Sequence, residues 1–293
     1  MASASPSRLI AQRVGLLCAL GAALLSAPVR AQGVPNLTYQ PSEVGTVLAR
    51  IDSSIGAPRG HGNVMIHRGY LTVIFSRDSG KGDGGFAFFD ISDPRTPTLV
   101  FAKDDDETED IREAHGYGVV RFEGRDLFFM QASFGLQVWD FTDVTAPFRV
   151  NYLKLPGITD SDYGTGAWFV FPQWPYLYLG GSSNGLYVVD IHDPSAPFLV
   201  DRAGLPNPIP PTLLGDFKTG PVYAAGNLLT ITGMDQPGYS TLDISRPEQP
   251  LLLTTRRDGL DSIYSGLFNG GFLYGAGTQS HVTVHDVRDP RSE

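Results

Sequence analysis

The chain has 293 residues, of which 42% are hydrophobic and 18% charged, and its formal net charge at pH 7 is -9. It is long enough for one large or two ordinary globular domains. An acidic surface without a basic stripe repels phosphate groups, which argues against nucleic acid and anionic lipid as partners.

Residues 1–31 have the pattern of an export signal. Arg8 and Arg13 precede an apolar run at 14–26, and small residues stand at the minus-three and minus-one positions of a signal-peptidase site that ends at Ala31. We therefore expect cleavage after Ala31 and a periplasmic or extracellular protein.

The apolar run at 14–26 is shorter than the roughly 20 residues that cross a bilayer as a helix, so no transmembrane anchor is expected. Cys18 is the one cysteine of the chain and leaves with the signal. No disulfide is therefore expected, and burial of apolar surface has to stabilise the fold. Residues 32–43 are predicted to be a linker.

A sixteen-residue segment recurs in the rest of the chain. GFAFFDISDPRTPTLV at 85–100, GLQVWDFTDVTAPFRV at 135–150 and GLYVVDIHDPSAPFLV at 185–200 begin fifty residues apart. Two more divergent copies follow, so the sequence predicts five repeat units. They are anchored on a shared aspartate, at Asp90, Asp140, Asp190, Asp243 and Asp286.

Each unit predicts four short strands with turns between them. An apolar strand ends at the anchor aspartate, an Asp-Pro turn follows, and a second proline such as Pro97 opens the next strand. Helical periodicity is almost absent after Ala31, so very little helix is expected. Four strands in roughly 40–50 residues are typical of a propeller blade. We therefore predict an all-β β-propeller of four-stranded blades.

The fifth unit stops at DPRSE, before its outermost strand. EVGTVLARID at 43–52 has the pattern of an outer strand without a partner, and a ring of blades has to cover its open edges. We predict that an N-terminal strand completes the last blade, so that residues 44–293 form a closed five-bladed propeller. A truncated six- or seven-bladed chain is the alternative, because the repeat period leaves the blade number open.

The repeat motif is G-φ-x-φ-φ-D-φ-S-D-P-x-x-P-φ-x-V, and Leu186–Asp190 reads LYVVD within it. On these residues the chain resembles the LVIVD-repeat family. The resemblance implies an extracytoplasmic β-propeller without an established common reaction. The last two units depart from the motif at Arg246, His285 and Glu293.

The anchor aspartates are interpreted as structural. A residue that recurs once per blade is spread around the ring, whereas a functional site needs groups that converge. A short carboxylate can accept hydrogen bonds from the N–H groups of the turn that follows it. We therefore predict turn caps at the anchors and at the downstream aspartates, such as Asp93.

The residue before the glycine of the innermost strand differs from blade to blade, and it is the main candidate for a ligand-binding site. Such residues tend to crowd one mouth of the central channel of a propeller. Two imidazoles from adjacent blades would then share a space with Arg59 and Glu113, which stand two residues earlier. The residues at this position are His61, His115, Thr165, Thr219 and Ser265.

Neutral imidazole is a good ligand for zinc, copper or iron, so His61 and His115 are candidate ligands of a divalent metal. A catalytic zinc site takes at least three protein ligands, and two histidines are too few. No cofactor is therefore certain. The alternative is that each imidazole donates a hydrogen bond to a turn carbonyl.

Trp174, at a predicted turn, is the best candidate for an exposed aromatic ring that stacks on a sugar or peptide, although packing in the core is the favoured interpretation. The acidic stretches 77–85 and 103–113 are interpreted as solvated loops rather than calcium sites. The proline-rich segment 204–217 predicts a stiff connection that is able to shape a binding groove or simply to pack.

Two functions follow from this sequence. The favoured one is noncatalytic binding of a protein or other envelope ligand through one face of the propeller, with the oligomeric state left open. The alternative is a metal-assisted hydrolase or lyase that uses His61 and His115 at the channel mouth. The sequence contains no H-E-x-x-H motif, no P-loop, and no glycine fingerprint placed after a strand and before a helix.

Overall fold

The computed structural model describes residues 47–49, 63–76, 84–111, 116–159, 164–201, 204–257, 262–277 and 282–291. They belong to one compact unit, Val47–Glu293. Every regular element among them is a strand, apart from one short 3-10 helix. In this part of the chain no helix is long and apolar enough to cross a membrane.

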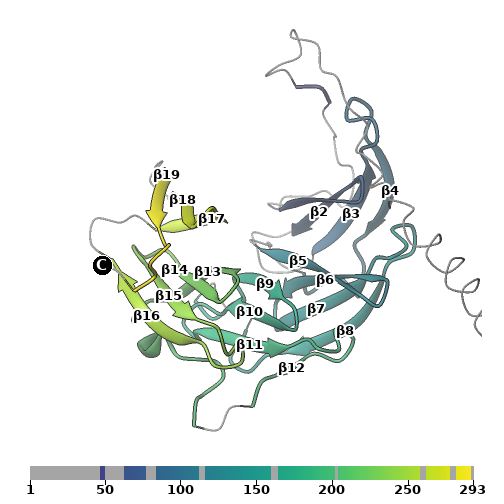
Figure 1. The fold of residues 1–293 in the computed structure, drawn as a ribbon. Coiled ribbons are helices and arrows are strands. Elements are labelled where there is room, and N and C mark those ends of the chain that lie inside the picture. The colour runs from purple at the N-terminus through teal and green to yellow at the C-terminus, as the bar shows by residue number, and fades with distance from the viewer. Residues whose placement is uncertain are drawn as a thin grey trace, which may run out of the picture. The chain divides into compact units, whose positions relative to one another are not determined.

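Five antiparallel sheets follow one another along the chain, and we number them as blades 1 to 5 (Figure 1). Blade 1 contains β1 (Val64–His67), β2 (Tyr70–Ser76), β3 (Gly84–Asp90) and β4 (Thr98–Lys103). Blade 2 contains β5 (Tyr117–Phe122), β6 (Arg125–Ala132), β7 (Gly135–Asp140) and β8 (Phe148–Lys154). Blade 3 contains β9 (Phe169–Gln173), β10 (Tyr176–Gly180), β11 (Leu186–Asp190) and β12 (Phe198–Leu199), and η2 (Pro211–Leu213) follows it. Blade 4 contains β13 (Thr219–Ala225), β14 (Leu228–Gly233), β15 (Tyr239–Asp243) and β16 (Leu251–Arg256), and blade 5 contains β17 (Ile263–Asn269), β18 (Phe272–Gly277) and β19 (Val282–Asp286).

Consecutive strands pair with each other in every blade, and the fold is the predicted all-β propeller. The recurring segment forms the third and fourth strands, and the anchor aspartates end the third strands, as predicted. In blades 1, 2 and 4 the register between these two strands shifts by one residue, which leaves Val100, Val150 and Leu253 as β-bulge residues. The last apolar residue of the motif thus bends the outer strand.

The outer strand of blade 3 is shorter than the sequence predicts, because β12 pairs over only two residues. Beyond it, the side-chain amide of Asn207 replaces a strand backbone: Nδ2 donates to the Val188 carbonyl at 2.8 Å, and Oδ1 accepts the Val188 N–H at 3.2 Å. Ile209 then pairs with Leu186 through two backbone hydrogen bonds of 2.8 and 2.9 Å. The proline-rich connection therefore completes blade 3 and is fixed against it.

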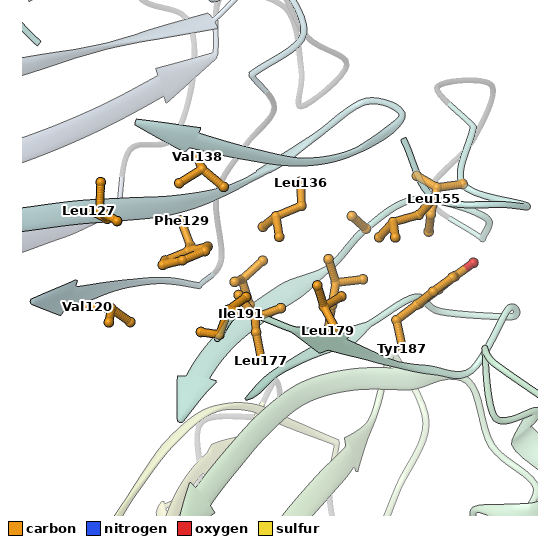
Figure 2. Close-up of a cluster of buried hydrophobic side chains, with 14 residues drawn as sticks. Val120, Leu127, Phe129, Leu136, Val138, Leu155, Leu177, Leu179, Tyr187 and Ile191 are labelled. Carbon is orange, nitrogen blue, oxygen red and sulfur yellow. The ribbon is translucent and has the colours of Figure 1, made fainter. Parts of the chain in front are cut away.

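The hydrophobic cores lie between neighbouring blades. In the core of Figure 2, Leu127 and Phe129 of blade 2 belong to the same cluster as Leu177 and Ile191 of blade 3, and all four side chains are fully buried. Truncation of one such leucine to alanine costs about 2–5 kcal/mol in well-packed cores. These contacts therefore hold successive blades together in a chain that has one cysteine and cannot form an internal disulfide.

The closing strand predicted over 44–51 lies mostly outside the described residues. Its described part, Val47–Ala49, has no strand structure. Within the described ranges blade 5 has three strands, and β19 pairs with β18 alone. Val282 and Val284 of β19 are exposed. Closure of the ring by the N-terminal segment stays a prediction.

Candidate functional site

The anchor aspartates cap the turns that follow them, as predicted. Asp90 accepts the backbone N–H of Ser92 at 2.8 Å, and Asp243 accepts that of Ser245 at 2.8 Å. These hydrogen bonds hold the pKa of both carboxyl groups below its usual value. Carboxylates engaged in this way do not converge on a ligand. The same bond recurs at Asp140, Asp190 and Asp286.

A second carboxylate caps the next turn in four blades, where it accepts the N–H two residues later at 2.9–3.1 Å. Blade 4 has the exposed Arg246 in this place. Its turn has the same backbone, because Gln249 N–H donates to the Arg246 carbonyl at 2.8 Å. Arg246 makes no ion pair or side-chain hydrogen bond with any described residue. The four aspartates are Asp93, Asp143, Asp193 and Asp289.

The charged and imidazole residues predicted at the channel mouth lie outside the described residues. They are His61, His115, Arg59 and Glu113. Among the residues that the structure describes, no group of three or more His, Cys, Asp or Glu side chains could hold a metal ion. A metal or ligand role for the two histidines stays a prediction.

The three hydroxyl residues predicted at the same mouth have separate surroundings. Thr219 is fully buried, and its Oγ1 donates to the Gly185 carbonyl at 2.6 Å. The Oγ1 of Thr165 lies 2.6 Å from the Oγ1 of Thr159. Ser265 is exposed in β17. Thr219 thus stabilises backbone of blade 3, a partner that local sequence could not reveal because it lies 34 residues away, whereas Thr165 pairs with a nearby side chain.

Trp174 is 52% exposed at the turn between β9 and β10, so the interpretation that it packs in the core is wrong. Its ring centroid lies 6.0 Å from that of His192, and the ring centroid of Tyr176 lies 5.6 Å from the same imidazole. The Nδ1 of His192 is 2.8 Å from a carboxylate oxygen of Asp190. This small aromatic platform on the turn surface keeps Trp174 available for stacking, and its role in ligand binding stays a prediction.

A groove of about 560 Å³ lies where blades 3 and 4 meet, within the usual size of ligand pockets. One wall is the proline-rich connection, and the other is formed by the turn before β16 and the first residues of β16. We call this surface the leucine groove. Its apolar lining is Leu205, Ile209, Leu213, Pro250, Leu251 and Leu252, and its polar lining is Thr212, Asp243, Ser245, Arg246 and Gln249.

The sequence of the connection explains why its leucines stay outside. Its prolines restrict the backbone, so the segment cannot rearrange freely. Ile209 and Leu214 are buried in the core between blades 3 and 4 and anchor the segment. Leu205 and Leu213 remain 40% and 47% exposed. Of the two alternatives that the sequence left open, the structure shows both, because the segment lines a groove and packs against the core. The wall from blade 4 was not predicted, because it lies about forty residues further along the chain.

A second, polar pocket of about 250 Å³ lies between blades 1 and 2. Its centre is the Asp126 side chain, which is only 1% exposed. One oxygen accepts a hydrogen bond from Arg68 at 2.5 Å and the other from Arg121 at 3.0 Å, while His67 Nε2 lies at 3.5 Å. Burial raises the pKa of Asp126, but the hydrogen bond from Arg68 and the nearby cationic groups lower it more, so the carboxyl stays ionised.

Sequence reasoning missed this ion cluster. In every blade, the N–H of the residue that follows the anchor aspartate donates to a backbone carbonyl at an equivalent position. In blade 2 this carbonyl belongs to Asp126, and four other residues hold the position in the other blades. None of those four carries a charge, which is the signal that distinguishes Asp126. They are Gly69, Pro175, Asn227 and Gly271.

Comparison with known proteins agrees with the repeat-built β-propeller that these turns and blades define. The family model of the LVIVD repeat matches residues 80–105 and 175–203, which contain the third strands of blades 1 and 3. The chain therefore contains LVIVD repeats in two places within a β-propeller fold, as the sequence resemblance implied. A search of the curated proteins found no match.

Several solved structures share the fold. The periplasmic gluconolactonase of Pseudomonas aeruginosa aligns with a TM-score of 0.53 at 16% identity, over 76% of this chain and 64% of that one. A functionally unknown protein from Desulfotomaculum acetoxidans DSM 771 aligns with a TM-score of 0.53 at 10% identity, over 84% and 77% of the two chains. A Bacteroides uniformis ATCC 8492 protein, provisionally assigned as a 6-phosphogluconolactonase, gives 0.52 at 10% identity, over 76% and 65%. The chain spans less than two thirds of the gluconolactonase, and identities this low show the fold alone.

Proposed function

We propose that this protein is an extracytoplasmic, noncatalytic binding protein that holds its partner in the leucine groove. The observation that carries the proposal is the pair of apolar walls, on which Leu251 and Leu213 are 65% and 47% exposed beside the same hollow. Hollows lined by apolar side chains with a few polar groups are typical of binding sites.

The walls are fixed before a partner arrives. Ile209 pairs with blade 3 through its backbone, and Leu214 anchors the connection in the core between blades 3 and 4. A partner would therefore gain about 25 cal/mol for each Å² of apolar surface buried, without first having to order a loop. This favours specific binding by a surface of modest size.

The lining favours binding over chemistry. Its one carboxylate, Asp243, is engaged by the N–H of Ser245 at 2.8 Å. The described lining includes neither histidine nor cysteine, and its other polar groups are amides, hydroxyls and a guanidinium. Nucleophilic catalysis needs a nucleophile beside a base, and this lining does not combine them.

Binding can be tested by selecting peptides from a phage-displayed dodecapeptide library on the purified protein. We expect apolar peptides that lose binding to the double variant Leu213→Asp, Leu251→Asp. The control is Phe148→Asp, which changes a residue that is 55% exposed at the same repeat position in blade 2. No enrichment, or equal retention by the groove variant, would contradict the proposal.

The extracytoplasmic location is supported by the signal-like pattern of residues 1–31. Expression of the full chain in a bacterial host, followed by cell fractionation and N-terminal sequencing, tests it. The expected product begins at Gln32 in the periplasm or medium. An uncleaved chain retained in the cytoplasm would contradict export.

The second candidate function is a metal-assisted hydrolase or lyase at His61 and His115. Two structural neighbours are named as lactonases, and this suggests a lactone as the first substrate to assay. Zinc titration of the wild type and of the double variant His61→Ala, His115→Ala is the test. Equal zinc binding by both proteins would remove this function.

A further inference from the structure

Arg246 in blade 4 departs from the repeat, and this substitution indicates the chemistry of the partner. The equivalent residue in the other four blades is an aspartate that caps its turn. Arginine has no acceptor and cannot make this cap. The turn forms nonetheless, through the hydrogen bond of 2.8 Å from Gln249 N–H to the Arg246 carbonyl. The fold therefore does not require an arginine at this position.

Arg246 also differs from the arginines at other turns. Arg125 donates to Asp140 at 2.7 Å, and Arg68 and Arg121 both donate to the buried Asp126. Arg246 has no such acceptor among the described residues, although it is exposed in the lining of the leucine groove. A guanidinium has five N–H donors in a planar fork that fits a carboxylate.

The other charge in the groove does not neutralise Arg246. Asp243 is the remaining charged residue in the lining, and its carboxylate accepts the N–H of Ser245 as a turn cap. The hydrogen bond from that N–H keeps the pKa of Asp243 low. The groove therefore combines an apolar surface with one cationic group whose donors are open to a partner.

The polar lining fits a polypeptide better than a simple acyl chain. A bound peptide carries N–H and C=O groups that need hydrogen-bond partners when they leave water. Thr212 and Gln249 place a hydroxyl and an amide in the groove, and neither side chain has a described partner. The leucines of both walls would contact the apolar side chains of such a peptide.

We infer that the leucine groove binds an apolar polypeptide segment whose carboxylate pairs with Arg246. The carboxylate belongs either to an acidic side chain or to the C-terminus of the segment. This inference rests on the proposed binding function and adds the chemical class of the partner.

The test uses fluorescein-labelled octapeptides of alternating leucine and threonine in a fluorescence polarisation titration. One carries a central glutamate, the second a glutamine in its place, and the third replaces the C-terminal amide of the second by a free carboxylate. We expect the wild type to bind one of the two carboxylate peptides about tenfold more tightly than the glutamine peptide. Preference for the first indicates a side-chain carboxylate, and preference for the third a C-terminal one.

The key variant is Arg246→Asp, which restores the residue found in the other blades and so preserves the turn. It should lose the tenfold preference for the carboxylate peptide over the glutamine peptide, while Arg246→Lys keeps part of that preference. Lys218→Asp is the matched control, because it makes the same change of charge at an exposed position outside the groove.

The outcomes separate this inference from the proposed function. Equal affinity of the wild type for all three peptides, at measurable strength, would overturn the pairing with Arg246 and leave the binding function intact. Failure to bind any of them, together with failure of the library selection, would overturn both. Decanoate that displaces the bound peptide and itself binds with higher affinity would overturn the choice of a polypeptide.

Discussion

Two boundaries between blades contain a charged residue that departs from the repeat. Asp126, between blades 1 and 2, stands where the other blades have an uncharged residue, and Arg246, between blades 3 and 4, stands where they have an aspartate. At the first boundary Asp126 is buried, and arginines from two different strand pairs neutralise it. At the second boundary Arg246 is exposed beside leucines and has no described acceptor. A charge satisfied within the chain stabilises the fold, whereas a charge left with open donors is available to another molecule.

The largest expected effect concerns the apolar part of the first boundary. Trp139 is 1% exposed and contacts Phe86 of blade 1 at a ring distance of 5.0 Å. Trp139→Ala should lower the free energy of unfolding by about 3–5 kcal/mol, because the cavity spans two blades. Urea denaturation measures this loss. Trp174→Ala is the control, and it should cost less than about 1 kcal/mol because that ring is half exposed.

The ion cluster gives the next largest effect. Asp126→Ala should lower the free energy of unfolding by about 2–3 kcal/mol, because it removes a buried acceptor of two charged hydrogen bonds. The double variant Arg68→Ala, Arg121→Ala should cost a similar amount, since it leaves the buried carboxylate without its donors. If the two proteins were as stable as the wild type in urea, the cluster would not be structural and the comparison between the boundaries would fail.

Acid should weaken the protein through its turn caps. Hydrogen bonds from the turns hold the pKa of Asp90, Asp143, Asp193 and Asp243 below its usual value, and a side-chain hydrogen bond from Arg288 lowers the pKa of Asp286 to about 2. Since these groups bind protons less readily when folded, they stabilise the protein above about pH 4 and lose that contribution toward pH 2. The urea midpoint of unfolding should be similar at pH 6 and pH 4 and lower at pH 3. A midpoint that rises below pH 4 would contradict the role of the caps.

The smallest effect is expected at Arg246. Arg246→Asp adds the missing cap and should raise the melting temperature by about 1–2 °C. The variant should also become slightly more sensitive to acid, because it gains one more capping carboxylate. Differential scanning calorimetry at pH 7 and pH 3 measures both changes. A lower melting temperature at pH 7 would show that Arg246 supports the turn itself.

Much of the architecture could be predicted from the sequence because each repeat contains the residues that determine its own turns and strands. The aspartate and proline spacing specifies the turn, and the anchors Asp90 and Asp243 accept the expected N–H groups. Strand order follows from the turns, since consecutive strands joined by short connections pair with each other. The all-β class and the four-stranded blades depend only on such local patterns.

The candidate site was predicted only in part, because it is built from residues that are far apart in the chain. The proline-rich wall could be recognised, but Leu251 and Arg246 reach it from the next blade. Trp174 was assigned to the core because a large apolar ring is usually buried, and nothing local shows that its neighbour is the exposed His192. Asp126 cannot be recognised as a buried ion pair from local sequence, because its partner Arg68 stands 58 residues earlier.

The bulges at Val100, Val150 and Leu253 determine which face of the blade each later side chain of the outer strand occupies. Side chains alternate between the two faces of a strand, so a single extra residue exchanges the faces beyond the point where it stands. Deletion of Leu253 would therefore turn the remainder of β16 over, with its outward side chains directed at the core and its inward ones at water. Loss of one residue there would be more harmful than almost any replacement, and the length of this segment is as much a part of the blade as its composition.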